Sequence, residues 1–174
     1  MKFRQLIHKS RLALAEQSHS GTALSLHVFS SGARWMHTQL NNEKKPQTAF
    51  NAEANYSAYG FLKYSVALLC MGVAAIALDK ISSWLVPLSV IVFYFAEIHF
   101  LFLFPLLIDN VKHPVTVSIQ QTYRTGVFTA LINIIPIGLY MMFGLLRFND
   151  PLRNWHIGCL AVVLWYKDEV RDRI

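Results

Sequence analysis

Charged side chains are scarce in this sequence of 174 residues: 15% are Asp, Glu, Lys or Arg, whereas 54% are hydrophobic. Soluble domains usually carry about a quarter charged residues, so the composition predicts a membrane protein. A disordered chain is excluded, because disorder requires low hydrophobicity and a high density of charge. The two cysteines are too few for a disulfide scaffold or a thiolate zinc site.

Sequence motifs of soluble catalytic domains are also lacking. There is no phosphate-binding glycine loop, no GxSxG, no HExxH and no CxxC. Histidines do not recur at spacings such as HxxxH, which membrane metal enzymes need, so we expect no metal site and no cofactor. The net charge of +6 does not indicate nucleic acid as a partner, because most of the excess precedes the first apolar run.

Three long apolar runs dominate the chain after residue 58. About 20 residues of helix cross a hydrocarbon core about 30 Å thick, and helices satisfy their own backbone groups there. Each run is therefore predicted to be a transmembrane helix. The runs cover residues 59–78, 84–108 and 125–146.

A fourth run, residues 154–166, is too short to be assigned by length alone. It is flanked by Arg153 and Lys167 and carries aromatic residues at both ends. Such ends are typical of a membrane interface, so we interpret the run as a fourth span. The alternative is an interfacial, re-entrant or packed core helix. The predicted fold is an all-α membrane protein with three to four transmembrane helices over residues 59–174.

The distribution of lysine and arginine predicts the orientation. With four spans, twelve of the fifteen basic residues outside the runs fall on one side; with three spans the division is nine against six. Cytoplasmic loops collect positive charge, so the four-span arrangement is favoured. We therefore expect both termini on the cytoplasmic side, or on its organellar equivalent.

Residues 1–58 form a separate basic region with seven Lys or Arg against three Glu. Residues 2–17 follow the pattern of a basic amphipathic helix, which predicts a tail lying on anionic headgroups. The alternative is a mitochondrial presequence ending near residues 35–39. The first interpretation favours a bacterial cytoplasmic membrane and the second a mitochondrial inner membrane. A secretory signal is excluded, because no uninterrupted apolar stretch of about 7–15 residues, the length that such a signal needs, precedes residue 59.

Four ionisable side chains are the candidate site residues: Glu97, His99, Asp109 and His113. Glu97 adjoins residue 96, the midpoint of the second run, where an ionised carboxylate is costly. We expect Glu97 to be protonated and to face other helices, because no basic residue lies deep in any run. His99 falls on a different face, and the other two lie in the following loop.

Pro105 and Pro136 can each kink the helix that contains them, because proline removes a backbone hydrogen bond. Gly126, Gly138 and Gly144 would permit close approach of neighbouring helices.

Three functions fit these features. The first is a non-enzymatic subunit or accessory protein of a membrane assembly, with partner helices or further copies of itself as neighbours in the bilayer. The second is a membrane-embedded enzyme acting on a lipid or isoprenoid, with Glu97 or Asp109 as general acid or base and His99 or His113 assisting. The third is an oligomeric proton or ion path that uses Glu97 as a relay.

Overall fold

The computed structural model describes residues 2–15, 28–41, 49–146 and 152–174, and within these ranges every regular element is a helix. The prediction of an all-helical chain is confirmed. In chain order the elements are α1 (Phe3–Ala15), α2 (Val28–Asn41), α3 (Tyr56–Asp79), the 3-10 helix η1 (Ser83–Leu88), α4 (Ser89–Ile98), α5 (Leu103–Ile108), α6 (Pro114–Thr125), α7 (Val127–Leu145), α8 (Arg153–Glu169) and the 3-10 helix η2 (Arg171–Arg173).

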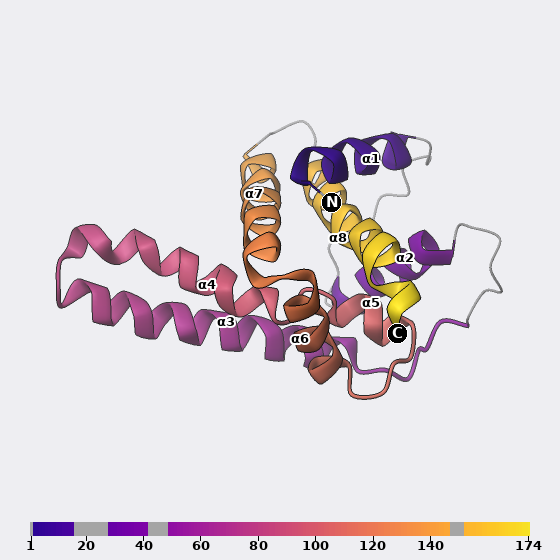
Figure 1. The fold of residues 1–174 in the computed structure, drawn as a ribbon, viewed down its shortest axis with the longest axis horizontal. Coiled ribbons are helices and arrows are strands. Elements are labelled where there is room, and N and C mark those ends of the chain that lie inside the picture. Colours follow the sequence, from indigo (N-terminus) through magenta and orange to yellow (C-terminus); the bar gives the residue numbers. More distant parts are fainter. Residues whose placement is uncertain (1, 16–27, 42–48, 147–151) are drawn as a thin grey trace.

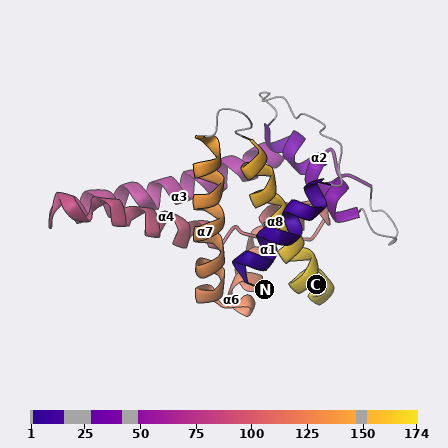
Figure 2. The same ribbon diagram turned by 90° about the horizontal axis from the view of Figure 1, so that it is seen from above.

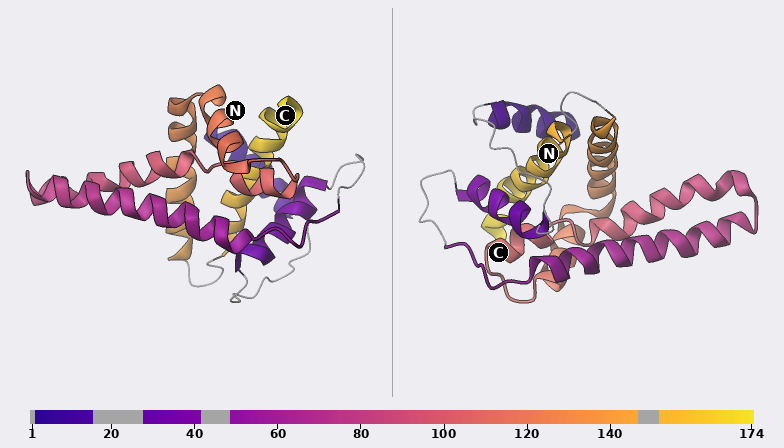
Figure 3. Two further views of the ribbon diagram at one scale, coloured as in Figure 1. Left: turned by 90° about the horizontal axis from the view of Figure 1, so that it is seen from below. Right: turned by 180° about the vertical axis from the view of Figure 1, so that it is seen from behind.

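The molecule consists of a long hairpin and a helical head (Figure 1). The hairpin has two antiparallel arms. One arm is α3, and the other is η1 followed directly by α4; both project far beyond the other helices. The head comprises α1, α2, α5, α6 and α8, and α7 lies across the hairpin where it meets the head. Figure 3 shows that both described ends of the chain lie in the head, away from the hairpin tip.

Three segments are long and apolar enough to cross a membrane: Tyr56–Asp79, Ser83–Ile108 and Val127–Leu145. They correspond to the three predicted runs. The fourth run lies within α8, which is not among these segments. Instead α8 is the central helix of the head, and Leu160, Trp165 and Tyr166 are almost fully buried by protein.

The second apolar run is bent rather than straight. Helix α4 ends at Ile98, residues 99–102 form turns, and α5 then enters the buried core of the head. Pro105 cannot donate to the carbonyl four residues earlier, and it sits in the first turn of α5, where no such bond is required. By contrast, α7 continues through Pro136. Only the first of the two prolines therefore follows a break in its helix.

Hydroxyl groups of α6 satisfy the carbonyls that this break releases. Thr122 Oγ1 donates to the carbonyl of Ile98 at 2.8 Å, and Ser118 Oγ donates to the carbonyl of His99 at 2.9 Å. Ser118 and Thr122 are four residues apart on one helix face, so they reach two successive carbonyls. The Ile98 carbonyl also accepts from the Leu101 N–H at 3.1 Å. Buried carbonyls without partners would be costly, and the two hydroxyl bonds from α6 add partners where the regular helix pattern stops.

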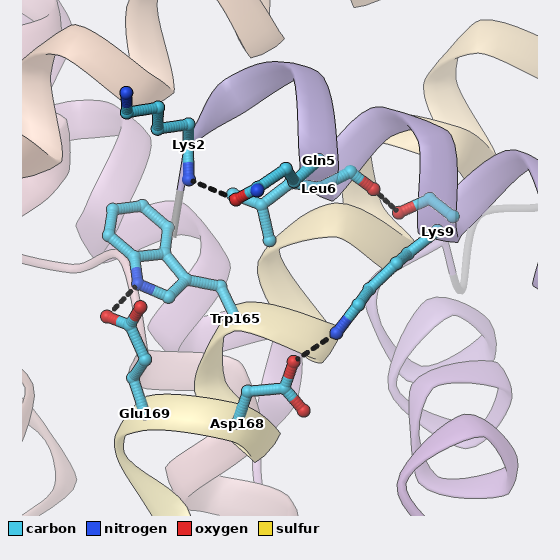
Figure 4. Close-up of polar contacts among 8 residues, drawn as sticks. Lys2, Gln5, Leu6, Lys9, Trp165, Asp168 and Glu169 are labelled. Atoms are coloured by element: carbon cyan, nitrogen blue, oxygen red, sulfur yellow. Dashed lines mark hydrogen bonds and ion pairs between the residues drawn. The ribbon is translucent and has the colours of Figure 1, made fainter.

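Helix α1 packs its apolar face against α8. Leu6 is fully buried and Ile7 nearly so. Beside them, Lys9 Nζ lies 3.1 Å from Asp168 Oδ2, as Figure 4 shows. The tail interpretation expected the apolar face on lipid headgroups, but in the structure protein covers it. Removing residues 1 to about 36, as in the presequence interpretation, would uncover this part of α8.

Glycines allow α7 to approach two neighbours closely. A Cβ at Gly138 would overlap the ring of Tyr94 on α4, and one at Gly144 would overlap the Asn154 side chain on α8. The expectation of close approach at these two glycines is therefore confirmed. Gly126 serves a different purpose, because its φ of 95° forms the turn between α6 and α7.

Candidate functional site

The most conspicuous polar contact of the hairpin is an ion pair at its base. Lys63 Nζ on α3 lies 3.0 Å from Glu97 Oε1 on α4, and the two side chains are only 11% and 15% exposed. The Lys63 ammonium also lies 5.4 Å from the ring centroid of Tyr64. Two opposite charges so well shielded from water satisfy each other, and they tie the two helices together at one level.

The expectation that no basic residue would lie at the depth of Glu97 is wrong. It assumed a straight helix over residues 84–108, in which Glu97 would occupy the middle. Because α4 ends at Ile98, Glu97 lies near the end of its helix, level with Lys63. The two residues are each seventeen positions from Lys80 in the hairpin turn, and this symmetry is the sequence signal that could have revealed the pair.

His99 occupies the turn that follows α4. Its Nδ1 lies 2.8 Å from the carbonyl oxygen of Phe95, and its Nε2 lies 3.4 Å from the hydroxyl of Tyr123 on α6. The ring also makes edge-on contacts with both aromatic side chains. His99 thus links the bend to α6 and does not take part in the ion pair.

Asp109 joins three parts of the head. Tyr166 donates its hydroxyl to Asp109 Oδ2 at 2.8 Å, and Arg171 Nη2 donates to Oδ1 at 2.9 Å. Arg171 Nη1 also donates to the carbonyl of Leu40 at 3.0 Å. Burial, reinforced by the charge of Asp109, raises the pKa of the Tyr166 hydroxyl, so this group remains a donor. Both carboxylate oxygens are engaged in holding α5, α8 and α2 together.

His113 lies on the surface at the start of α6. Its backbone has a φ of 54° and ψ of 55°, in the left-handed region, and Pro114 follows as the first helical residue. Asn110 has a similar φ of 56°, and its side-chain oxygen accepts a hydrogen bond from Asn51 at 2.7 Å. These residues shape the connection between α5 and α6.

The four candidates therefore have separate local roles. Glu97 pairs with α3, His99 contacts its own turn and α6, and Asp109 binds α8 and η2. His113 is exposed. Among the described residues, no group of three or more His, Cys, Asp or Glu side chains could hold a metal ion. The contacts of the first three hold helices together.

Cys159 of α8 is a further group that sequence reasoning did not select. Burial raises the pKa of its thiol to about 11, while the charge of Lys63 lowers it and that of Glu97 raises it. The thiol therefore lies within electrostatic range of the ion pair. Its high pKa keeps it in the neutral form, which is a poor nucleophile.

A polar groove of about 410 Å³ lies in the head between α1, α2 and the end of α8. It contains basic and acidic side chains, and Lys9 and Asp168 form an ion pair within it. The opposing charges leave little net attraction for an anionic ligand. The lining residues are Lys9, Leu40, Asn41, Lys167, Asp168, Arg171 and Asp172.

The chain matches no protein family, curated protein or solved structure with which it was compared. Its function is therefore argued from its own residues.

Proposed function

We propose that this protein is a non-enzymatic subunit or accessory protein of a membrane assembly, held in the bilayer by the hairpin. The observation that carries the proposal is the apolar outer surface of the hairpin. Leu69 is 70% exposed and Trp84 is 92% exposed, although both are large and apolar. A projection covered with such side chains is stable in hydrocarbon and costly in water.

Polar groups at the two ends of the hairpin fit this placement. The ion pair lies at the base, and at the tip Ser83 Oγ donates to Asp79 Oδ1 at 2.8 Å. The sixteen helical steps from Lys63 to Asp79 rise about 24 Å. This is somewhat less than the thickness of a hydrocarbon core, and Lys80 can reach the far headgroups by extending its side chain.

The charge distribution supports an orientation in which the head lies on one side of the membrane and the hairpin tip reaches the other. Lys80 is the one lysine or arginine of the sequence that belongs to the hairpin tip, and the other fifteen lie at the base or in the rest of the chain. By the positive-inside rule, the head then faces the cytoplasm of a bacterium or, as the alternative, the mitochondrial matrix. Both termini belong to the head in this arrangement.

The contacts of the candidate residues favour an accessory role over the two alternatives. A lipid or isoprenoid enzyme would need an acid or base that faces its substrate, whereas Asp109 has both oxygens bound by protein. A proton path would need the Glu97 carboxylate to face a route for protons, whereas its Oε1 lies 3.0 Å from Lys63 Nζ in a contact shielded by protein. Partner helices or further copies of the chain would cover part of the apolar surface.

Insertion of the hairpin can be tested with two exposed leucines. Leu69 on α3 and Leu12 on α1 are 70% and 56% exposed, so neither substitution disturbs a buried core. Leu69→Lys should weaken insertion, because a lysine deep in hydrocarbon costs about 3 kcal/mol. Leu12→Lys should leave it unchanged. Retention in membranes after alkaline carbonate extraction measures the difference, and equal retention of the two variants would contradict the placement.

The accessory role itself is tested by purification from the native membrane in a mild detergent, followed by mass measurement. A different protein present in fixed stoichiometry would support the proposal. A bound lipid or isoprenoid that the purified protein converts would establish the enzyme instead. A homo-oligomer whose proton flux disappears in Glu97→Gln would establish the proton path.

A further inference from the structure

Helix α7 runs across the long axis of the hairpin and not alongside it. Figure 1 shows this arrangement, and the view from above in Figure 2 agrees with it. The crossing is close, because Tyr94 of α4 packs directly on Gly138 near the middle of α7. A helix that crosses an inserted hairpin in this way runs along the membrane surface. In this arrangement the hairpin and α7 cannot both cross one bilayer.

All the exposed large apolar side chains of α7 except Leu145, which is 46% exposed, form a single stripe. At 100° per residue they fall within an arc of about 100°, which is the width of one amphipathic face. The face opposite contains buried residues, including Ile134 and Ile137. The stripe consists of Phe128, Ile132, Leu139, Met142 and Phe143, with Leu146 directly after the helix, and each is at least 41% exposed.

The stripe faces the same way as the hairpin projects. On the opposite side of α7, Gly144 packs on Asn154 and Met141 packs on Gly158, so α8 covers that side. In Figures 1 and 2, α8 lies on the side of α7 that is away from the hairpin tip. The stripe therefore continues the apolar surface of the hairpin at its base.

Aromatic and basic side chains flank both ends of α7. Tyr123, which is 58% exposed, and the exposed Arg124 precede the helix. At the other end, Asn154 contacts Gly144, and its neighbours Arg153 and Trp155 are both exposed. Aromatic and cationic residues of this kind are enriched at the level of lipid headgroups. Their presence indicates that each end of α7 lies at headgroup level, and the direction of α7 across the hairpin then places both ends on the same side of the bilayer.

We propose that α7 is an in-plane helix whose stripe is covered by bilayer lipid at the boundary between headgroups and acyl chains. This inference rests on the proposed insertion of the hairpin. The in-plane position of α7 also fixes the depth of the Lys63–Glu97 pair. Helix α7 crosses α4 at Tyr94, and Glu97 lies three residues, or about 4.5 Å, nearer the head. The ion pair is thereby placed at headgroup level, where two charges are tolerated.

Depth-dependent fluorescence quenching tests the inference on the full chain. In a Cys70→Ala/Cys159→Ala background, single cysteines replace Phe128, Leu139 or Leu146, and each is labelled with an environment-sensitive dye. The proteins are reconstituted in vesicles of phosphatidylcholine and phosphatidylglycerol that carry quenchers either at the headgroup or deep in the acyl chains. Val73→Cys, on the hairpin, reports insertion, and Leu12→Cys, on α1, is the control in the head.

An in-plane α7 predicts one common ratio of shallow to deep quenching at its three positions, with the shallow quencher more effective. Val73→Cys should show the reverse, and Leu12→Cys should show little quenching by either. A spanning α7 would make the Leu139→Cys label the deepest of the three and overturn the inference. Loss of quenching on α7 alone would also overturn it, since another protein would then cover the stripe. Loss at Val73→Cys would instead overturn the proposed insertion of the hairpin.

Discussion

Removing one charge of the Lys63–Glu97 pair should destabilise the protein more than removing both. The pair is 3.0 Å apart, and its side chains are 11% and 15% exposed. Breaking a buried pair costs about 3–5 kcal/mol because the remaining charge has no partner, whereas replacing both members with neutral groups is often nearly neutral. Since some exposure remains, we expect about 3 kcal/mol for Lys63→Met or Glu97→Gln alone, and less than about 1 kcal/mol for the double variant.

The free energy of unfolding in mixed detergent micelles measures this difference for the four proteins of the double-mutant cycle. The more exposed pair of Lys9 and Asp168, with side chains 52% and 34% exposed, provides the control. Its equivalent cycle should give a coupling of less than about 1 kcal/mol. Fluorescence of the native tryptophans can follow both cycles under the same conditions.

Additive effects of Lys63→Met and Glu97→Gln would refute this reasoning, because additivity means that the two residues do not interact. A normal stability for Glu97→Gln together with a complete loss of proton flux would also refute it. That second result would restore the proton-relay interpretation, in which the proton matters and the ion pair does not. The double variant separates the two cases. Pairing predicts that the double variant regains the stability lost in the single variants, whereas a relay predicts that its proton flux stays absent.

Three further predictions concern the head and its contact with α7. Gly144→Ala should destabilise by about 1–3 kcal/mol through overpacking, whereas Gly32→Ala, with open space at its Cβ, should be neutral or slightly stabilising in thermal unfolding. Leu6→Ala should cost about 2–5 kcal/mol because Leu6 is fully buried, whereas Leu12→Ala on the same helix should change stability by less than about 0.5 kcal/mol. Cys159, with its pKa raised to about 11, should react with a maleimide at pH 8 about a thousandfold more slowly than its thiolate, and the rate should rise as pH approaches 11. Mass spectrometry of the modified peptide measures this rate, and fast modification at pH 8 in the folded protein would contradict the raised pKa of the thiol.

Hydrophobic pattern was sufficient to predict the helical class and the approximate ends of the long segments. The run over residues 59–78 became α3, which ends at Asp79, and the run over 125–146 became α7, which begins after Gly126. Both ends coincide with residues that interrupt an apolar pattern locally, a charge in one case and a glycine in the other. Local signals of this kind need no knowledge of tertiary contacts.

The bend after Ile98 could not be predicted in the same way. Apart from His99, residues 99–102 are as apolar as the helices on either side, so hydropathy gives no clear boundary there. The bend depends on Ser118 and Thr122, which supply the missing hydrogen bonds from a helix some twenty residues later. Pro105 was a local hint, but Pro136 within α7 shows that a proline alone does not fix a break.

The candidate site was predicted only as a set of residue types. Asp109 was selected as an acid, but its partners Tyr166 and Arg171 lie 57 and 62 residues away in sequence. Lys63 lies near the start of its apolar run, and its pairing with Glu97 follows only once α3 and α4 are aligned from Lys80. Long-range pairing of this kind depends on how the helices pack, which a single sequence does not specify.

The expected placement of both termini on one side holds for two spans as well as for four. If α8 belongs to the head and α7 lies in the plane of the membrane, two of the four predicted crossings disappear together. An even number remains, so both termini stay on the same side. The charge argument also becomes stronger, because for the same fifteen basic residues outside the runs a division of fourteen against one replaces twelve against three. The rule that favoured four spans over three thus favours two spans over four, once the bend and the crossing of α7 are taken into account.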